Sequence, residues 1–293
     1  MIITHKIAAL TATLTTALSL LAAPAMAFSV GATNNTETLK NNLLGANTAG
    51  LSNFSVSITG NSAAFGTFTN DPFGLTSGVV LSTGKVTDIR GRNRRDNFTT
   101  TNISDLSTDF GPEGEEGDLT QLNLSFFANS TVEKLVFQYV FASEEFPEFG
   151  NSEFNDDFEL LLNGTNLAKL SDGKTVTINN LVPDPYNRST YHPDYIDNPS
   201  LTGIAANIVK LDGFTKILGF EGLLKQNQTN VLSIRIKDVG DGKLDSAVFI
   251  KGGSVETVQA EPVPEPMTVG GLMAGGAMLA AGRKLRNRRA GSN

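Results

Sequence analysis

Apolar and polar residues alternate with a period of two along much of this chain. Residues 54–58, 122–126 and 231–236 show the alternation most clearly, and it is typical of strands with one buried face. Shorter apolar runs lie between them, separated by turn-forming pairs such as Asn163-Gly164. Residues 37–44 instead have helical spacing and precede Gly45. The pattern predicts an all-β fold, a jelly-roll-like β-sandwich with one short N-terminal helix and long end loops.

Two stretches are poor in strand signal and are expected to form those long loops. Residues 90–117 open with four arginines and then become acidic. Residues 183–199 contain four prolines, three tyrosines and His192. Loops at the ends of a sandwich often carry binding residues, although a plain solvated loop would have a similar composition.

The N-terminal residues have the pattern of a secretory signal peptide. Lys6 precedes an uncharged apolar and hydroxyl-rich run, which is followed by Ala25-Met26-Ala27. The small residues Ala25 and Ala27 suit the groove of signal peptidase. We therefore expect cleavage after Ala27, which leaves Phe28 as the first mature residue, rather than a buried core helix.

The C-terminal residues form a second three-part pattern. An extended stretch, Val263-Pro264-Glu265-Pro266, precedes an uncharged run of 15 residues at 268–282, and a basic cluster begins at Arg283. A transmembrane helix needs about 20 apolar residues, so this run is short for a permanent span. The chain thus divides into a signal peptide (1–27), a β domain (28–258) and a linker with a sorting segment (259–293) that contacts the membrane.

Removing both ends exposes a strongly acidic body. The whole chain has a net charge of −7, but residues 28–266 contain all 30 acidic residues and only 17 of the 23 basic ones, a net charge of −13. This charge argues against a nucleic-acid partner. The chain has no cysteine, so an exported domain must be stabilised by its core, by metal, or by both.

Two acidic loops are candidates for a Ca²⁺ site, because Ca²⁺ prefers six to eight oxygen ligands. The first, 141–158, interleaves carboxylates with phenylalanines that could pin the loop to the core. The second, 237–246, contains glycines that permit tight turns. The alternative is that these side chains only cap turns. The candidate ligands are Glu144, Glu145, Glu148, Asn155, Asp156, Asp157, Asp238, Asp241 and Asp245.

The two acidic motifs and the segment 78–84 resemble the choice-of-anchor L domain of bacterial surface proteins. The resemblance covers residues 36–254 and implies a surface β domain without an established activity. Glu159 stands where relatives tend to have an apolar residue, which is expected to weaken packing there. The C-terminal pattern resembles the PEP-CTERM sorting signal of Gram-negative bacteria and cyanobacteria that produce exopolysaccharide. That resemblance implies an exosortase that cuts near Pro264-Glu265-Pro266; a simple tail anchor is the alternative.

These observations favour a non-enzymatic protein of the cell envelope, cell surface or biofilm matrix that binds polysaccharide or a surface protein. Tryptophan is absent, which leaves Tyr186, Tyr191 and Tyr195 as aromatic platforms for sugars, unless they are core anchors. The alternative is an extracellular glycosidase or lyase that takes its acid and base from the carboxylates of the first acidic loop. A serine hydrolase is disfavoured because no Gly-x-Ser-x-Gly motif is present.

Overall fold

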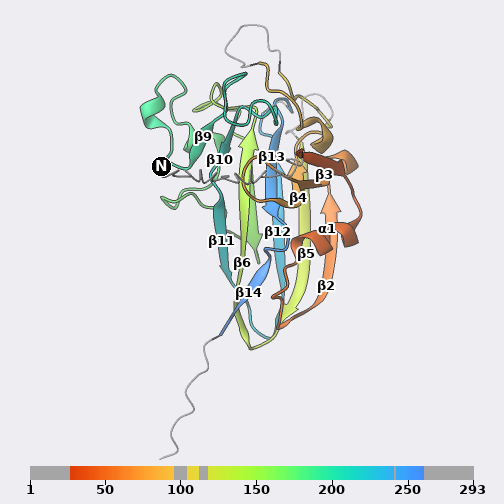
Figure 1. Ribbon diagram of the computed structural model, residues 1–293. Helices are drawn as coiled ribbons and strands as arrows, with labels where there is room; N and C mark the ends of the chain where they lie inside the picture. The colour runs from red at the N-terminus through yellow and green to blue at the C-terminus, as the bar shows by residue number, and fades with distance from the viewer. Residues whose placement is uncertain (1–26, 96–103, 112–117, 241, 261–293) are drawn as a thin grey trace, which may run out of the picture.

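The computed structural model of the protein describes residues 27–95, 104–111, 118–240 and 242–260 (Figure 1). The predicted signal peptide up to residue 26, the predicted sorting segment from residue 261 onward, and Asp241 lie outside these residues. The described chain folds into two antiparallel sheets packed face to face, which confirms the predicted all-β sandwich. Within these ranges, no helix is long and apolar enough to cross a membrane.

The smaller sheet has five strands, and its central strands are the ones that alternate most clearly in the sequence. Inward residues of β5 and β12 are buried while their neighbours are partly exposed, as expected for a sheet with one solvated face. The order across the sheet is β2 (Leu51–Thr59), β5 (Leu119–Ala128), β12 (Gln228–Lys237), β7 (Asp157–Leu162) and β8 (Thr165–Asn166).

The larger sheet is built around the long strand β6, which runs the length of the sandwich. β10 and β11 pair with β6 along one edge, and β13 and β14 pair with it along the other. The path across the sheet is β1 (Ser29–Ala32), β3 (Phe65–Thr69), β4 (Ser77–Ser82), β13 (Ser246–Lys251), β6 (Val132–Ser143), β10 (Gly213–Thr215) and β9 (Tyr195–Asp197), with β11 (Leu218–Leu223) and β14 (Glu256–Gln259) in addition.

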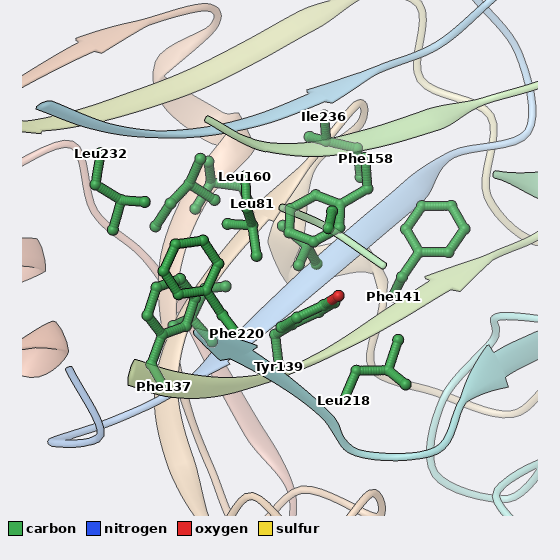
Figure 2. Packing of buried hydrophobic residues seen from close by; sticks show 14 of the residues in the cluster. Leu81, Phe137, Tyr139, Phe141, Phe158, Leu160, Leu218, Phe220, Leu232 and Ile236 are labelled. Atoms are coloured by element: carbon green, nitrogen blue, oxygen red, sulfur yellow. The ribbon is translucent and has the colours of Figure 1, made fainter. Parts of the chain in front are cut away.

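The main core fills the space between the two sheets (Figure 2). Tyr139 of the large sheet meets Phe158 of the small sheet at a ring-centroid distance of 5.1 Å, and Phe137 stacks on Phe220 at 4.4 Å. Leu160 and Ile236 project into the same space from the small sheet. Burial of this many aromatic and aliphatic side chains accounts for a stable domain without cysteine.

A second core covers the outer face of the large sheet. Phe68, Val140 and Phe249 point away from the first core and pack beneath irregular segments that contribute Leu75, Ile89 and Val209. Both faces of β4, of β13 and of the final part of β6 (Tyr139–Ser143) are therefore buried. This explains the continuous apolar runs at 79–81, 139–142 and 247–250 in place of alternation.

The helices are short. α1 (Thr36–Leu43) agrees with the predicted N-terminal helix, and the Asn35 side chain caps it by accepting from the Thr38 N–H at 2.9 Å. A second helix, α2 (Ile178–Leu181), was not predicted, because one turn is too short to show a helical period. The described residues also contain three single 3₁₀ turns: η1 (Ser62–Ala64), η2 (Val86–Asp88) and η3 (Arg188–Thr190).

Glu159 lies on the outer face of the small sheet. Its neighbours Phe158 and Leu160 point into the core, and its carboxylate pairs with Arg235 on β12 at 3.1 Å. The expectation that Glu159 weakens packing is therefore wrong, because a charged residue at an outward position displaces no core side chain.

Candidate functional site

The two acidic loops meet at one end of the sandwich, here called the acidic end (the upper end in Figure 1). β6 finishes at Ser143 and β13 begins at Ser246, and these two serines are register partners. The residues just beyond them, Glu144 and Asp245, are thus neighbours, and the Glu144 N–H donates to the Asp245 carbonyl oxygen at 3.2 Å. Strand register brings together two acids that lie about 100 residues apart in sequence.

A third segment, residues 104–111, lies against this pair and is held by carboxylates. Glu144 accepts a hydrogen bond from the Asp105 N–H, and Asp245 accepts one from the Thr108 N–H at 2.7 Å. Asp118, at the entry to β5, accepts from the Phe110 N–H at 2.7 Å. Sequence analysis missed Asp118, because its role depends on the segment that folds back over it.

Burial gives these acids unusual proton affinities. Desolvation raises the pKa of Glu144 to about 9; the Asp105 N–H opposes this shift, and the nearby Asp245 and Asp105 carboxylates reinforce it. Desolvation likewise raises the pKa of Asp245 to about 7, with Asp118 and Asp88 adding to the shift. The acidic end therefore concentrates carboxyl groups where water is excluded and their ionised forms are disfavoured, and a cation bound there would favour the ionised forms.

Asp245 has an oxygen that the described residues leave unsatisfied. Its Oδ1 accepts from Thr108, whereas its Oδ2 is buried and has no hydrogen-bond partner in the described ranges. That oxygen lies against Gly84, where an added Cβ would come within 1.8 Å of it. A buried carboxylate oxygen without a donor fits coordination by a hard cation.

Other predicted ligands serve as turn and loop connectors. Asp156 accepts from the Val239 N–H at 2.9 Å and from the Ser246 hydroxyl at 2.6 Å, so it ties one acidic loop to the other. Asn155 caps α2 through the Asn179 N–H, and Asp238 accepts from the Gly242 N–H within its own loop. For these three residues the alternative of backbone capping describes what the structure shows.

The remaining candidates are spread around the acidic end. Glu145 is buried beside Glu144, while Glu148 is half-buried farther along the loop. Asp157 begins β7 opposite Lys237, and burial raises its pKa. Across the described residues, no three side chains of His, Cys, Asp or Glu are grouped closely enough to hold a metal ion. A cation here would need carbonyl or water ligands as well.

The phenylalanines of the first acidic loop anchor it as predicted. Phe146 is fully buried and contacts Phe141 and Tyr195, with ring centroids 6.2 and 4.8 Å away. Phe149 and Phe154 pack edge to face at 5.5 Å. These rings fix the backbone that carries Glu144 and Asp156.

The tyrosine loop provides little aromatic surface. Tyr195 is buried in the main core, and Tyr191 packs against it while its hydroxyl donates to the Pro185 carbonyl oxygen at 2.8 Å. Tyr186 is 85% exposed. Two of the three tyrosines are core anchors, so a continuous sugar-stacking platform is not formed by this loop.

His192 serves the structure of the same loop. Its Nδ1 accepts a hydrogen bond from the Asp194 N–H at 3.1 Å, and Asp194 in turn accepts from the Ser171 N–H. The imidazole is 8% exposed. The imidazole therefore holds the backbone of this loop in place, and its Nδ1 already accepts a hydrogen bond, which does not suit a general base.

Burial also weighs against the alternative of a glycosidase or lyase. Glu144, Glu145 and Asp156 are at most 1% exposed, and Asp156 already accepts two hydrogen bonds. An acid and a base for polysaccharide cleavage must contact the glycosidic oxygen and the anomeric carbon, or a water between them. These carboxylates do not reach an open surface.

The fold and site define an all-β sandwich domain whose two acidic loops meet at one end. Comparison with protein families identifies it further, because the Choice-of-anchor L domain matches residues 29–256. The chain therefore belongs to the Choice-of-anchor L domain family, which indicates an exported, surface-anchored and non-enzymatic protein. No curated protein and no solved structure matches the chain.

Proposed function

We propose that this protein is a calcium-stabilised display domain that binds polysaccharide or other surface components outside the cell. The observation that carries the proposal is the buried pair Glu144 and Asp245, which strand register holds side by side at the acidic end. Two carboxylates in a water-poor site favour either protonation or a bound cation. At extracellular calcium concentrations, we expect a bound cation rather than protonation of the two carboxylates.

The proposed ligands come from two loops that only the folded chain brings together. Glu144 and Asp245 supply buried carboxylates, backbone carbonyls or water would complete the coordination, and Asp118 adds negative charge nearby without being a ligand. All the donors are oxygens, which suits Ca²⁺ rather than a transition metal. Binding would stabilise the segment 104–111, whose backbone these carboxylates already hold.

The positions of the two ends of the sandwich support outward display of the acidic end. β14 pairs with the beginning of β6, whereas Glu144 follows its last residue. A strand rises about 3.3 Å per residue, so the acidic end and the C-terminal exit lie roughly 35 Å apart. If the C-terminal segment holds the chain at the envelope, the acidic end faces outward.

The proposal also includes proteolytic processing at both ends of the chain. Signal peptidase would cut after Ala27, and an exosortase-type enzyme would act near Val263–Pro266. Phe28 is the first described residue that is buried, at 5% exposure. A mature chain that begins there would keep the second core intact.

Thermal unfolding with and without calcium tests the stabilising role. A ligand that binds only the folded state raises the melting temperature as its concentration increases. We expect added Ca²⁺ to raise the melting temperature of the exported protein and a chelator to lower it, with Mg²⁺ less effective. The variant Glu144→Gln/Asp245→Asn should lose the response, whereas Glu221→Gln, a surface acid distant from the site, should keep it. An unchanged melting temperature in calcium would rule out the metal role.

A further inference from the structure

A pocket lined by both apolar and polar residues lies at the edge of the second core, away from the acidic end. It has a volume of about 490 Å³, within the range of about 300–1,000 Å³ common for small-ligand sites. Arg90 and Arg92 form its basic wall, and Asn70 and Asn207 add amide groups. Phe28, Pro72 and Ile208 supply apolar surface. The lining thus combines charge, hydrogen-bonding groups and apolar contacts.

The backbone that presents the two arginines is fixed like a strand. The Gly91 N–H donates to the Ile208 carbonyl oxygen at 3.0 Å, and the Asn93 N–H donates to the Ala206 carbonyl oxygen at 2.8 Å. Ile89 and Asn93 are fully buried on one side. Because side chains alternate along an extended segment, Arg90 and Arg92 project to the other side, toward solvent.

Buried polar contacts hold this segment in place. The Asn93 side chain donates to the Asn198 carbonyl oxygen at 2.9 Å and also to the Asp212 carboxylate. Asn198 donates in turn to the Leu211 carbonyl oxygen at 2.7 Å. The network joins residues 89–93 to residues 198–212, so the arginines stand on a preorganised support.

Both guanidinium groups remain available for an anion. Among the described residues, neither Arg90 nor Arg92 takes part in an ion pair. Arg92 Nε donates to Asn207 Oδ1 at 3.1 Å, which orients the group and leaves its terminal nitrogens for a ligand. The Asp71 carboxylate in the same pocket accepts from the Phe73 and Leu75 N–H groups through Oδ1, whereas its Oδ2 has no hydrogen-bond partner among the described residues, so the lining also contains one acidic group. Residues 28–266 have a net charge of −13, yet these two arginines form no ion pair with any described residue, so an anionic ligand could use both guanidinium groups.

We propose that this pocket binds an anionic saccharide unit, with its acidic group on Arg90 and Arg92. A guanidinium presents paired N–H donors that match the two oxygens of a carboxylate. The asparagine amides suit sugar hydroxyls, and the apolar residues suit the C–H faces of a pyranose ring. The inference rests on the proposed polysaccharide-binding role, and it specifies the site and the charge of the ligand.

Binding of the exported protein to polygalacturonate tests the pocket. Dextran serves as the neutral polymer, and dextran sulfate separates a sulfate ester from a carboxylate as the recognised group. We expect binding to polygalacturonate that weakens with salt, and weaker or no binding to dextran. Arg90→Ala/Arg92→Ala should reduce affinity about tenfold or more. Arg90→Lys/Arg92→Lys should recover only part of it, because the charge returns without the paired donors.

The matched control is Arg94→Ala/Arg95→Ala, which removes the same charge from the same loop but from outside the pocket lining. We expect it to keep affinity within about threefold, since only long-range attraction changes. Each variant should melt cooperatively and keep its calcium response. A chelator should not abolish binding to polygalacturonate. If it did, calcium ions would be bridging the acidic protein and the acidic polysaccharide.

The outcomes separate this inference from the proposed function. An equal loss in both arginine pairs, or loss of binding in chelator, would overturn the pocket. Binding to dextran that is unaffected by Arg90→Ala/Arg92→Ala would preserve the polysaccharide role and reject this site. Failure of the wild-type protein to bind any of the three polymers would overturn the pocket, whereas the calcium response of the melting temperature tests the proposed function separately.

Discussion

At the scale of single residues, the acidic end is defined by buried carboxylates that accept hydrogen bonds from backbone N–H groups in place of water. Glu144 and Asp245 are at most 1% exposed, and each accepts from the segment 104–111. One hydrogen bond does not compensate fully for the desolvation of an ionised carboxylate. This uncompensated desolvation raises the pKa of both groups. We therefore expect the stability of the protein to depend on pH and on cations.

In the absence of calcium, we expect the protein to lose stability as the pH rises from about 5 to about 9. The pKa is about 9 for folded Glu144 and about 7 for folded Asp245, above the ordinary values of 4.5 and 3.8. Between those values the folded state binds more protons than the unfolded state, so the free energy of unfolding falls with pH. Thermal unfolding at several pH values in chelator measures the fall.

Calcium should flatten this pH dependence, because it stabilises the ionised carboxylates. The variant Glu144→Gln/Asp245→Asn should flatten it without calcium, since neither side chain then titrates. If the free energy of unfolding of the double variant in chelator falls with pH as steeply as that of the wild type, titration of Glu144 and Asp245 does not cause the fall.

The contact between Gly84 and Asp245 gives a second prediction at the residue scale. An alanine Cβ at position 84 would lie 1.8 Å from Asp245 Oδ2, so the carboxylate must move. We expect Gly84→Ala to lower the free energy of unfolding by about 1–3 kcal/mol and to weaken the calcium response. Chemical denaturation with and without calcium measures both effects.

The control for this substitution is Gly219→Ala. Gly219 lies in β11, and an added Cβ there would meet no atom within 4 Å. It should leave both stability and the calcium response nearly unchanged. Equal effects of the two substitutions would show that the close approach at Gly84 is unimportant.

At the scale of elements, alternation was a good guide for strands that have one solvated face. Residues 54–58, 122–126 and 231–236 fall within β2, β5 and β12 of the small sheet. The strands β8, β9 and β10 have only two or three residues, too few for a period to be recognised. These strands form because neighbouring strands supply hydrogen-bond partners. Such partners are distant in sequence and cannot be recognised from the local pattern.

Alternation on β7 predicts unequal costs for two adjacent substitutions. Glu159 faces outward and pairs with Arg235, so Glu159→Leu should cost at most about 1 kcal/mol. Leu160 is fully buried between the sheets, so Leu160→Ala should cost about 2–5 kcal/mol. Denaturant unfolding of both variants measures the difference. Similar costs would contradict the outward placement of Glu159.

At the scale of the whole molecule, the acidic end and the C-terminal exit lie at opposite ends of β6. The pocket at Arg90 and Arg92 opens beside the second core, on the outer face of the large sheet. A domain held by its C-terminal segment would thus present the acidic end outward and the pocket sideways.

Processing at both ends is the prediction that belongs to this scale. The exported protein should begin at Phe28, and its mass should match loss of the segment after the Pro-Glu-Pro sequence. Replacing Pro264 and Pro266 by alanine should leave the C-terminal segment attached, while export continues. Intact-mass analysis of the envelope and medium fractions measures both ends. A chain that keeps residues 267–293 in every fraction would support a simple tail anchor.

The sequence by itself determined the all-β class, the N-terminal helix, the acidic composition of the two loops and the patterns at both ends. These features are local: a period of two, a capped turn or a charge run can be recognised within a few residues. Tertiary structure alone decided that Glu144, Asp245 and Asp118 share one end, that Tyr191 and Tyr195 are core anchors, and that Arg90 and Arg92 line a pocket. The reason is physical, because strand register and the packing of distant segments determine which side chains lose water and which remain accessible.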